Sequence, residues 1–233
     1  MRLWHAWLAA GLVAGAMGAM SALAGEAEWK ALHDRVVPQL MSGDLKAAER
    51  LARDAVAEAQ RTFGAAHLNT AASQSNLALV LHYLQREEES EKVYRQAWAV
   101  RAKLQGVMHP STALLLLNLA DVVQAQGRFA DAEKLQREAL GVFEKIVGDD
   151  TRTAAALNNL GANLQRQRRY REAEPVLRRA LAMKEKVLGP ASASVANTLN
   201  NLADVCEELG RKDEAAALRK RMEEIRKKAT QKA

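Results

Sequence analysis

Apolar residues recur three to four positions apart along most of the chain, which is the spacing of an amphipathic helix. The helical stretches come in pairs. One pair is predicted over residues 111–126 and 130–147, with Gly127 between its helices and Gly148 after the second. A glycine at a helix end readily adopts left-handed backbone, so both glycines mark helix ends. No Val/Ile/Thr-rich stretch alternates with polar residues, and no strand is predicted.

The helical pairs form an internal repeat with a period of about 42 residues. An Asn-Leu-Ala or Asn-Leu-Gly triplet marks the first helix of each pair. The triplets begin at Asn76, Asn118, Asn159 and Asn201, so the successive steps are 42, 41 and 42. The distance from each Asn to the next closing glycine is constant along the chain, so the missing residue lies in the loop after Gly148. A deletion inside a helix would rotate every later side chain by about 100°.

This pattern resembles the tetratricopeptide repeat. The 42-residue spacing, the Asn-Asn-Leu-Ala of the first helix and the stretch GRFADAEKLQREAL are similar to the kinesin light chain type. The resemblance implies an all-α, right-handed superhelical solenoid of antiparallel helix pairs, because one pair cannot bury its apolar face alone. Residues 25–66 are expected to form a degenerate N-terminal repeat or cap. The four full repeats and the basic C-terminal tail are expected at 67–108, 109–148, 149–189, 190–228 and 229–233.

Two turns depart from the pattern. Gln85 and Arg168 stand where Gly127 and Gly210 stand in the other repeats. A residue other than glycine costs about 1 kcal/mol in left-handed backbone. These two turns are therefore candidates for a different backbone conformation.

Residues 1–24 have a composition of their own. Arg2 is their only formal charge, residues 8–20 are apolar and often small, and the segment closes with Ala-Leu-Ala at 22–24. This order predicts a signal peptide over residues 1–24, cleaved near Ala24, and a periplasmic or secreted mature protein. The alternative is an uncleaved anchor, although the apolar run is short for a span of ~20 residues.

The repeated asparagines are expected to line the concave side of the solenoid. The leucine after each one should pack inward, which places the asparagine about 100° away on the helix. An Asn amide offers donors and an acceptor that match a peptide backbone. In kinesin-light-chain-like repeats matching asparagines line a peptide-binding groove, and the resemblance implies the same role here. The expected peptide-binding residues are Asn76, Asn118, Asn158, Asn159, Asn197, Asn200, Asn201, Leu114, Leu117, Asp121 and Arg166.

The alternative role of the asparagines is to tie adjacent repeats together, and both roles can coexist. Asn158 and Asn200 favour ligand contact, because Ser75 and Leu117 hold the same place in the earlier repeats. A residue needed only for stacking should appear in every repeat.

The helix around Leu114 and Leu117 is apolar on nearly every face. In an open solenoid one of these faces would look into the groove. We therefore predict an apolar pocket there, flanked by Asn118 and Asp121. The alternative is that a neighbouring loop or another copy of the chain covers the leucines.

No pattern in the sequence supports an enzyme, a metal site or a cofactor, and no catalytic residue is predicted. Cys206, the only cysteine, falls at a repeat position that is otherwise apolar, so we expect it in the core. His67 and His109 lie one repeat apart. Successive repeats are on the order of 10 Å apart, too far for two histidines to share a metal that needs ligands at ~2 Å.

The charge lies at the C-terminal end. Residues 211–233 hold nine Lys and Arg against four Asp and Glu, whereas residues 25–210 balance at 24 of each sign. Opposite charges spaced i,i+4 suggest a solvated capping helix.

The predicted function is a protein–protein interaction scaffold that binds a peptide segment of a partner. The alternative is a structural or regulatory subunit that self-associates, or that docks to an acidic partner or the envelope through this helix. No nucleic acid partner is expected; weak membrane contact and homo-oligomerisation stay open.

Overall fold

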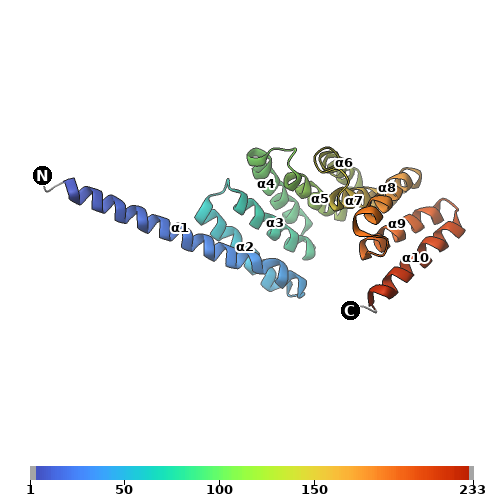
Figure 1. The fold of residues 1–233 in the computed structure, drawn as a ribbon, viewed down its shortest axis with the longest axis horizontal. Helices are drawn as coiled ribbons and strands as arrows, with labels where there is room; N and C mark the ends of the chain where they lie inside the picture. The colour runs from blue at the N-terminus through green and yellow to red at the C-terminus, as the bar shows by residue number, and fades with distance from the viewer. Residues whose placement is uncertain (1–3, 231–233) are drawn as a thin grey trace. The chain divides into compact units, whose positions relative to one another are not determined.

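The computed structural model describes the backbone of residues 4–230 and the side chains of residues 23–228. Ten α-helices and no strand lie within the described backbone. The helices are α1 (Trp4–Met41), α2 (Leu45–Phe63), α3 (Leu68–Tyr83), α4 (Glu87–Gln105), α5 (Pro110–Ala125), α6 (Phe129–Ile146), α7 (Thr151–Arg166), α8 (Tyr170–Leu188), α9 (Ala193–Glu208) and α10 (Lys212–Thr230). Figure 1 shows them as successive helix pairs, which confirms the predicted all-α repeat architecture.

The chain divides into two compact units, Met1–Leu104 and Gln105–Ala233. The first unit holds α1 to α3 and nearly all of α4, and the second holds α5 to α10. Most of the predicted signal peptide, residues 1–24, lies outside the residues whose side chains are described. Among the described residues, no helix has an apolar stretch long enough to cross a bilayer.

The observed helix boundaries lie within one residue of the predicted pair at 111–126 and 130–147. Two residues separate Gly148 from the start of α7 at Thr151, whereas three separate Gly189 from the start of α9 at Ala193. The deletion therefore lies in this loop, as predicted. The last turn of α6 adapts to the shorter connection: Gly148 N donates to Phe143 O, five residues back, at 2.9 Å.

The repeat positions predicted to face the core are buried. Leu77, Leu119, Leu160 and Leu202 are the leucines that follow the repeated asparagines, and each is at most 6% exposed. Cys206 is fully buried, like Leu164 at the same position of the preceding repeat. Burial raises the pKa of the Cys206 thiol, so the side chain is a neutral apolar filler.

Close approach of two helices depends on a small residue at one position of the first helix. In α7 this residue is Gly161, and a methyl group built on it would lie 2.6 Å from Cγ of Leu177 in α8. Leu177 is fully buried against it. The glycine thus accommodates a large side chain on the facing helix.

The turn after each first helix has the same form in all four repeats. The φ angles are 59° at Gln85 and 60° at Arg168, close to 78° at Gly127 and 81° at Gly210. In each turn the next residue donates its N–H five residues back, as Arg169 does to Leu164 O at 2.9 Å. The idea of a different conformation at Gln85 and Arg168 is therefore wrong. The hydrogen bonds that close the helix end outweigh the left-handed strain.

The residues before each first helix act as caps. His67 and His109 accept hydrogen bonds through Nδ1 from the backbone N–H two residues on, both at 3.1 Å. Asp150 and Ser192 do the same through side-chain oxygens at the starts of α7 and α9. The spacing of the two histidines by one repeat therefore reflects the repeated helix start.

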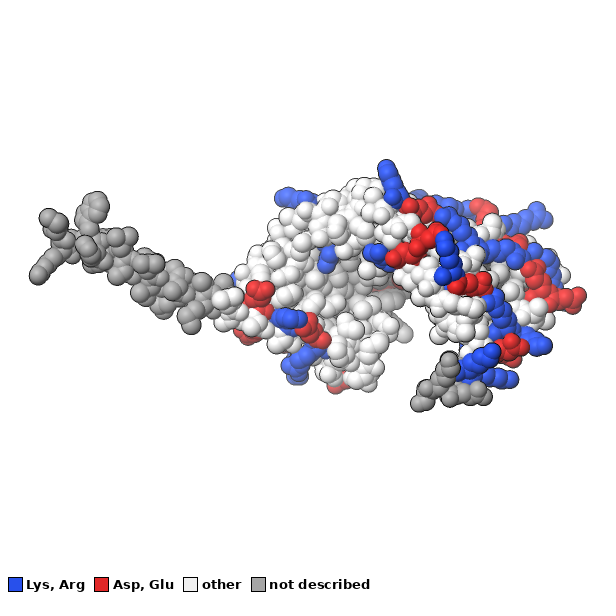
Figure 2. Space-filling view, viewed as in Figure 1, with Lys and Arg blue, Asp and Glu red and all other residues white. Residues whose placement is uncertain are grey.

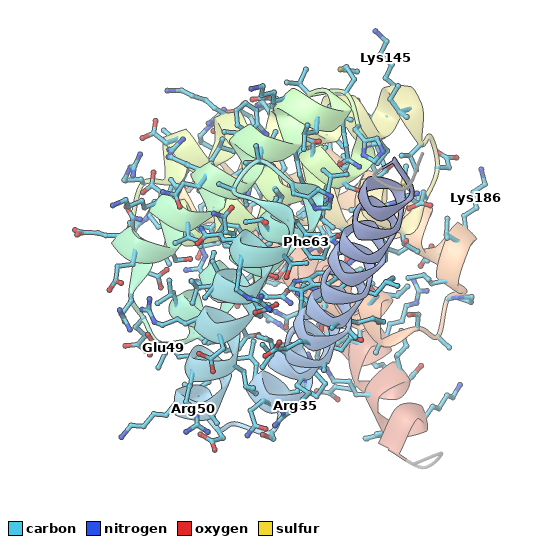
Figure 3. All side chains as sticks on the ribbon, turned by 90° about the vertical axis from the view of Figure 1, so that its left-hand side faces the viewer. Arg35, Glu49, Arg50, Phe63, Lys145 and Lys186 are labelled. Atoms are coloured by element: carbon cyan, nitrogen blue, oxygen red, sulfur yellow. The ribbon has the colours of Figure 1, made fainter. Side chains whose placement is uncertain are left out.

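A periodic set of ion pairs, not among the expectations from the sequence, joins neighbouring repeats. Arg169, just after the turn, lies 2.5 Å from Glu133 of the preceding repeat, and Arg211 lies 2.5 Å from Glu174. In the first unit Arg86 lies 2.6 Å from Glu49, which points outward from α2 (Figure 3). We call these pairs the Arg–Glu bridges. Figure 2 shows positive and negative side chains lying next to one another over the second unit.

Lysines stand near the ends of the second helices. Lys145 and Lys186 lie in the last turns of α6 and α8 and extend into solvent (Figure 3). A positive charge is favourable there because the helix C-terminus carries partial negative charge.

Gly161→Ala should lower the free energy of unfolding by about 1–3 kcal/mol, because the new methyl group overlaps Leu177 and the overlap exceeds the gain in helix propensity. Gly141→Ala in α6 is the matched control. A methyl group there meets no atom within 4 Å, so stability should rise by up to about 1 kcal/mol. Urea denaturation measures both, and equal effects of the two substitutions would contradict the packing argument.

Gln85→Gly and Arg168→Gly should each raise the free energy of unfolding by up to about 1 kcal/mol, because glycine relieves the left-handed strain. Part of the gain is lost to the greater freedom of glycine in the unfolded chain. Gly127→Ala should have the opposite effect. Chemical denaturation of the three variants tests this, and a loss of stability in both glycine variants would refute it.

Candidate functional site

The predicted peptide-binding asparagines of the second unit lie on α5, α7 and α9. Asn118, Asn159 and Asn201 are half-buried, and the leucine after each is buried. Asn158 and Asn200 are half-buried, and Asn197 is exposed. We call these six residues the asparagine face. Its amides are accessible from outside the core, as a contact surface requires.

A chain of hydrogen bonds ties part of the asparagine face to the next repeat. Thr198 Oγ1 donates to Asn158 Oδ1 at 2.8 Å, and Asn201 Nδ2 lies 3.4 Å from the same oxygen. Lys184 Nζ donates to Thr198 Oγ1 at 2.8 Å and to Ser194 O at 3.2 Å. Asn158 is therefore a link between α7 and α9, whereas its absence from earlier repeats favoured ligand contact; whether it also contacts a ligand stays a prediction.

The first unit contains the same link at equivalent repeat positions. His33 corresponds to Asn158, Ser73 to Thr198 and Asn76 to Asn201. In this link His33 Nδ1 lies 3.2 Å from Ser73 Oγ and 3.5 Å from Asn76 Nδ2. Burial is the main cause that lowers the pKa of His33, which favours the neutral ring that can accept.

An aromatic cluster supports this first-unit link. Trp29 Nε1 donates to Ser73 Oγ at 2.8 Å. The Trp29 ring meets Phe63 edge-on at 5.2 Å between centroids, and Phe63 stacks on His67 at 4.8 Å. Phe63 thus lies beside α1 (Figure 3). Asn76 accordingly sits at a repeat-to-repeat contact.

Asn118 and Asn159 differ from Asn76 and Asn201. Within the described residues, neither Asn118 nor Asn159 has a side-chain hydrogen bond to the protein. The residue three positions before Asn159 is Ala156, which has no hydroxyl with which to form the link. Both amides are half-buried and keep their donors and acceptor for another molecule.

The two predicted apolar contacts have different environments. Leu114 is 45% exposed, whereas Leu117 is 5% exposed. The exposed apolar surface of α5 at this place therefore comes from Leu114. Asn118 beside it is half-buried, and Asp121 is exposed and engaged in an interaction of its own.

A polar hollow of about 490 Å³ lies at the end of the asparagine face, between α7 and α9. Its walls include Arg166, Tyr170, Asn201, Asp204 and Glu208. This volume is in the range of ligand sites, about 300–1,000 Å³. The hollow brings two of the predicted residues, Arg166 and Asn201, to one place.

Part of the acidic wall of this hollow is neutralised from α10. Arg219 Nη2 lies 3.0 Å from Asp204 Oδ1 and also contacts Glu207. Asn200 Nδ2 lies 3.4 Å from Asp204 Oδ2. Arg166 and Glu208 are exposed, and neither has a side-chain partner in the described part of the protein. The hollow therefore presents both signs of charge.

No group of three His, Cys, Asp or Glu side chains that could hold a metal lies among the described residues. Lys184, the buried cation of the link, is held by neutral oxygens. Burial lowers the pKa of its ammonium, because the charged form is separated from water.

Lys184→Met should raise the free energy of unfolding at pH 7 by an amount on the order of 1 kcal/mol, since it removes a buried unpaired charge. The folded-state pKa is lowered, so the charge costs stability below that pKa and the cost disappears as pH rises toward the unfolded value of 10.5. The advantage of the variant should therefore shrink at alkaline pH. Urea denaturation at pH 7 and near pH 10.5 measures it, and a pH-independent difference would contradict the argument.

Comparison with known proteins places this geometry in a family. The tetratricopeptide repeat model matches residues 40–103, 75–145, 111–186 and 152–228. A search of curated proteins found no match. Among solved structures, kinesin light chain-type repeats from Podosopora anserina align with a TM-score of 0.72 at 23% identity, over 86% of this chain and 95% of that chain.

Two further structures show the same fold. BtubC (BKLC) from P. vanneervenii aligns with a TM-score of 0.73 at 25% identity, over 84% of this chain and 78% of that chain. The apo form of RapI aligns with a TM-score of 0.75 at 16% identity, over 88% and 72%. Because the family matches extend from residue 40 to residue 228, this chain belongs to the tetratricopeptide repeat family.

Proposed function

We propose that this chain is a protein–protein interaction scaffold that binds a peptide segment of a partner protein on the asparagine face. The observation that carries the proposal is the pair of half-buried amides at Asn118 and Asn159, which have no hydrogen-bond partner among the described residues. Water reaches these amides, so binding exchanges water for a peptide group, and each such hydrogen bond contributes about 0.5–1.5 kcal/mol net. A peptide backbone supplies the acceptor and donor that such amides lack.

The asparagines have different roles in different repeats. Asn76 and Asn201 belong to links between repeats and hold the scaffold in shape. Asn118 and Asn159 contact the ligand backbone and read little of its sequence. Sequence selectivity comes from exposed side chains next to the row: Leu114 offers an apolar contact, and Arg166 offers a charge.

The basic C-terminal helix is less suited to bind the partner. Arg211, just before α10, and Arg219 and Arg221 within it are ion-paired with acidic residues of the protein. Arg226 and Lys227 also have interactions within the described residues. This distribution supports the asparagine face over α10 as the main contact surface.

The site of action is also part of the proposal. The charge, apolar run and small-residue motif of residues 1–24 support export to the periplasm or the exterior, with cleavage near Ala24. A partner would then be another exported or envelope protein. No catalytic activity is proposed.

The test begins with peptides selected from a random display library on the immobilised full chain. Asn118→Ala/Asn159→Ala should weaken their affinity about tenfold or more, because two hydrogen bonds of about 0.5–1.5 kcal/mol each are lost. The free energy of unfolding should hardly change. Titration calorimetry and urea denaturation provide the two readouts.

Asn76→Ala/Asn201→Ala is the matched control. It removes the same two amide groups from the linked positions, so stability should fall while affinity changes little. Raising the salt concentration should weaken the binding of these peptides only modestly, since salt screens the single exposed charge of Arg166 but not the amide contacts. If only the linked pair altered affinity, or if neither pair did, the proposed role of Asn118 and Asn159 would be wrong.

A further inference from the structure

The turn between α7 and α8 is unusually rich in arginine. Arg166, Arg168, Arg169 and Arg171 lie within six residues, around Tyr170. Arg169 forms the bridge to Glu133 and also pairs with Glu172. The other three arginines are exposed and have no side-chain partner in the described part of the chain.

The repeats themselves show that these three arginines are not needed for stacking. The arginine at the Arg169 position recurs as Arg86, Arg128 and Arg211. The positions of Arg166, Arg168 and Arg171 hold no basic residue in the other three full repeats. Their counterparts are Tyr83, Gln85 and Glu88, then Ala125, Gly127 and Ala130, and then Glu208, Gly210 and Asp213.

The backbone of Arg168 is also strained. Its φ of 60° lies in left-handed backbone, where the equivalent Gly127 and Gly210 fit without strain. Within the described residues, its side chain forms no hydrogen bond or ion pair that would offset the strain. Gln85 has the same strain, so it is the exposed charge of Arg168 together with the strain that makes this residue a candidate for function.

The arginines border two hollows. Tyr170 lines the hollow of about 490 Å³ together with Arg166, and a second one of about 280 Å³ together with Arg168, Arg171 and Leu209. From this arrangement we propose that Arg166, Arg168, Arg171 and Tyr170, the arginine turn, bind an acidic segment of a partner protein. Arginine suits this task because its guanidinium group binds carboxylates through two parallel hydrogen bonds.

The neighbouring charges favour a polypeptide over a continuous polyanion. Asp204, Glu207 and Glu208 line the larger hollow beside Arg166. A nucleic acid strand or an anionic lipid surface would bring further negative charge against these carboxylates. A polypeptide can place Asp or Glu on the arginine turn and neutral or basic residues beside the carboxylates. The proposal goes beyond the asparagine face, and Arg166 is the only residue of the arginine turn that is also among the proposed peptide contacts.

The probe is fluorescein-labelled hexaglutamate, titrated into the full chain and followed by anisotropy. Each exposed charge pair contributes about two- to fivefold to affinity. Arg168→Gly/Arg171→Gln should therefore weaken binding by about tenfold. A rise in salt from about 0.05 to 0.5 M should weaken binding to the wild type, because screening acts on exposed charges.

Arg168→Gly alone separates binding from folding. It should make the chain more stable yet weaken hexaglutamate binding, which a purely structural arginine could not do. Gln85→Gly is the matched control: it relieves the same strain in the equivalent turn and should leave hexaglutamate binding unchanged. The proposal would be overturned if the wild type and Arg168→Gly/Arg171→Gln bound hexaglutamate with the same affinity.

Three further arms identify the class of partner. Hexalysine should not bind the arginine turn. A single-stranded oligothymidine and anionic phospholipid vesicles are the other two probes. If either bound more tightly than hexaglutamate, and if the arginine variants lost that binding, the partner would not be an acidic protein segment. Asn118→Ala/Asn159→Ala should bind hexaglutamate like the wild type. If only that variant lost hexaglutamate binding, the acidic segment would bind the asparagine face and the arginine turn would not be its binding site. This conclusion would hold whatever the outcome for the selected peptides.

Discussion

The structure depends on one constraint: a pair of helices leaves an apolar face that only a neighbouring pair can cover. The leucine that follows each repeated asparagine is buried by this contact, as is Leu177 where it meets Gly161. Every other regularity follows from it. Once each pair must present the same face to its neighbours, the same positions recur as core, cap and turn.

Two kinds of polar contact fix how neighbouring pairs meet. Glu133 illustrates the first, since it accepts hydrogen bonds from Arg137, Gln167 and Arg169, two of them in the following repeat. Burial, the largest single influence, would raise the pKa of Glu133, but these hydrogen bonds together lower it below its usual value. The links through Asn158 and His33 are the second kind. Such contacts add direction to an apolar interface that by itself is only weakly directional.

The sequence was sufficient for the repeat, the helix boundaries, the site of the deletion and the buried leucines, because all of these depend on periodicity and apolar spacing. It was insufficient for the backbone conformation at Gln85 and Arg168. The cost of left-handed backbone at a residue other than glycine is about 1 kcal/mol, and the hydrogen bonds of the turn outweigh it. The sequence did not show which asparagines bond to the neighbouring repeat and which do not. That difference depends on a second position in the neighbouring repeat, as the hydrogen bond from Thr198 to Asn158 shows.

A local signal for that division does exist. A hydroxyl residue stands three positions before each linked asparagine, as Ser73 and Thr198 do before Asn76 and Asn201. Leucine or alanine stands at the same place before Asn118 and Asn159. The Arg–Glu bridges were likewise visible as a basic residue after each turn, but their partners become evident only when neighbouring repeats are brought together in space.

The Arg–Glu bridges bear on how such a chain can evolve. Each joins the same two positions of successive repeats, at nearly the same separation along the chain. Recombination that duplicated or excised one whole repeat would therefore bring a new arginine opposite an old glutamate with the pairing intact. The molecule can lengthen or shorten in steps of one repeat while the contacts between neighbouring repeats stay the same, and single substitutions three positions before the asparagines then decide which of them form a link to the neighbouring repeat.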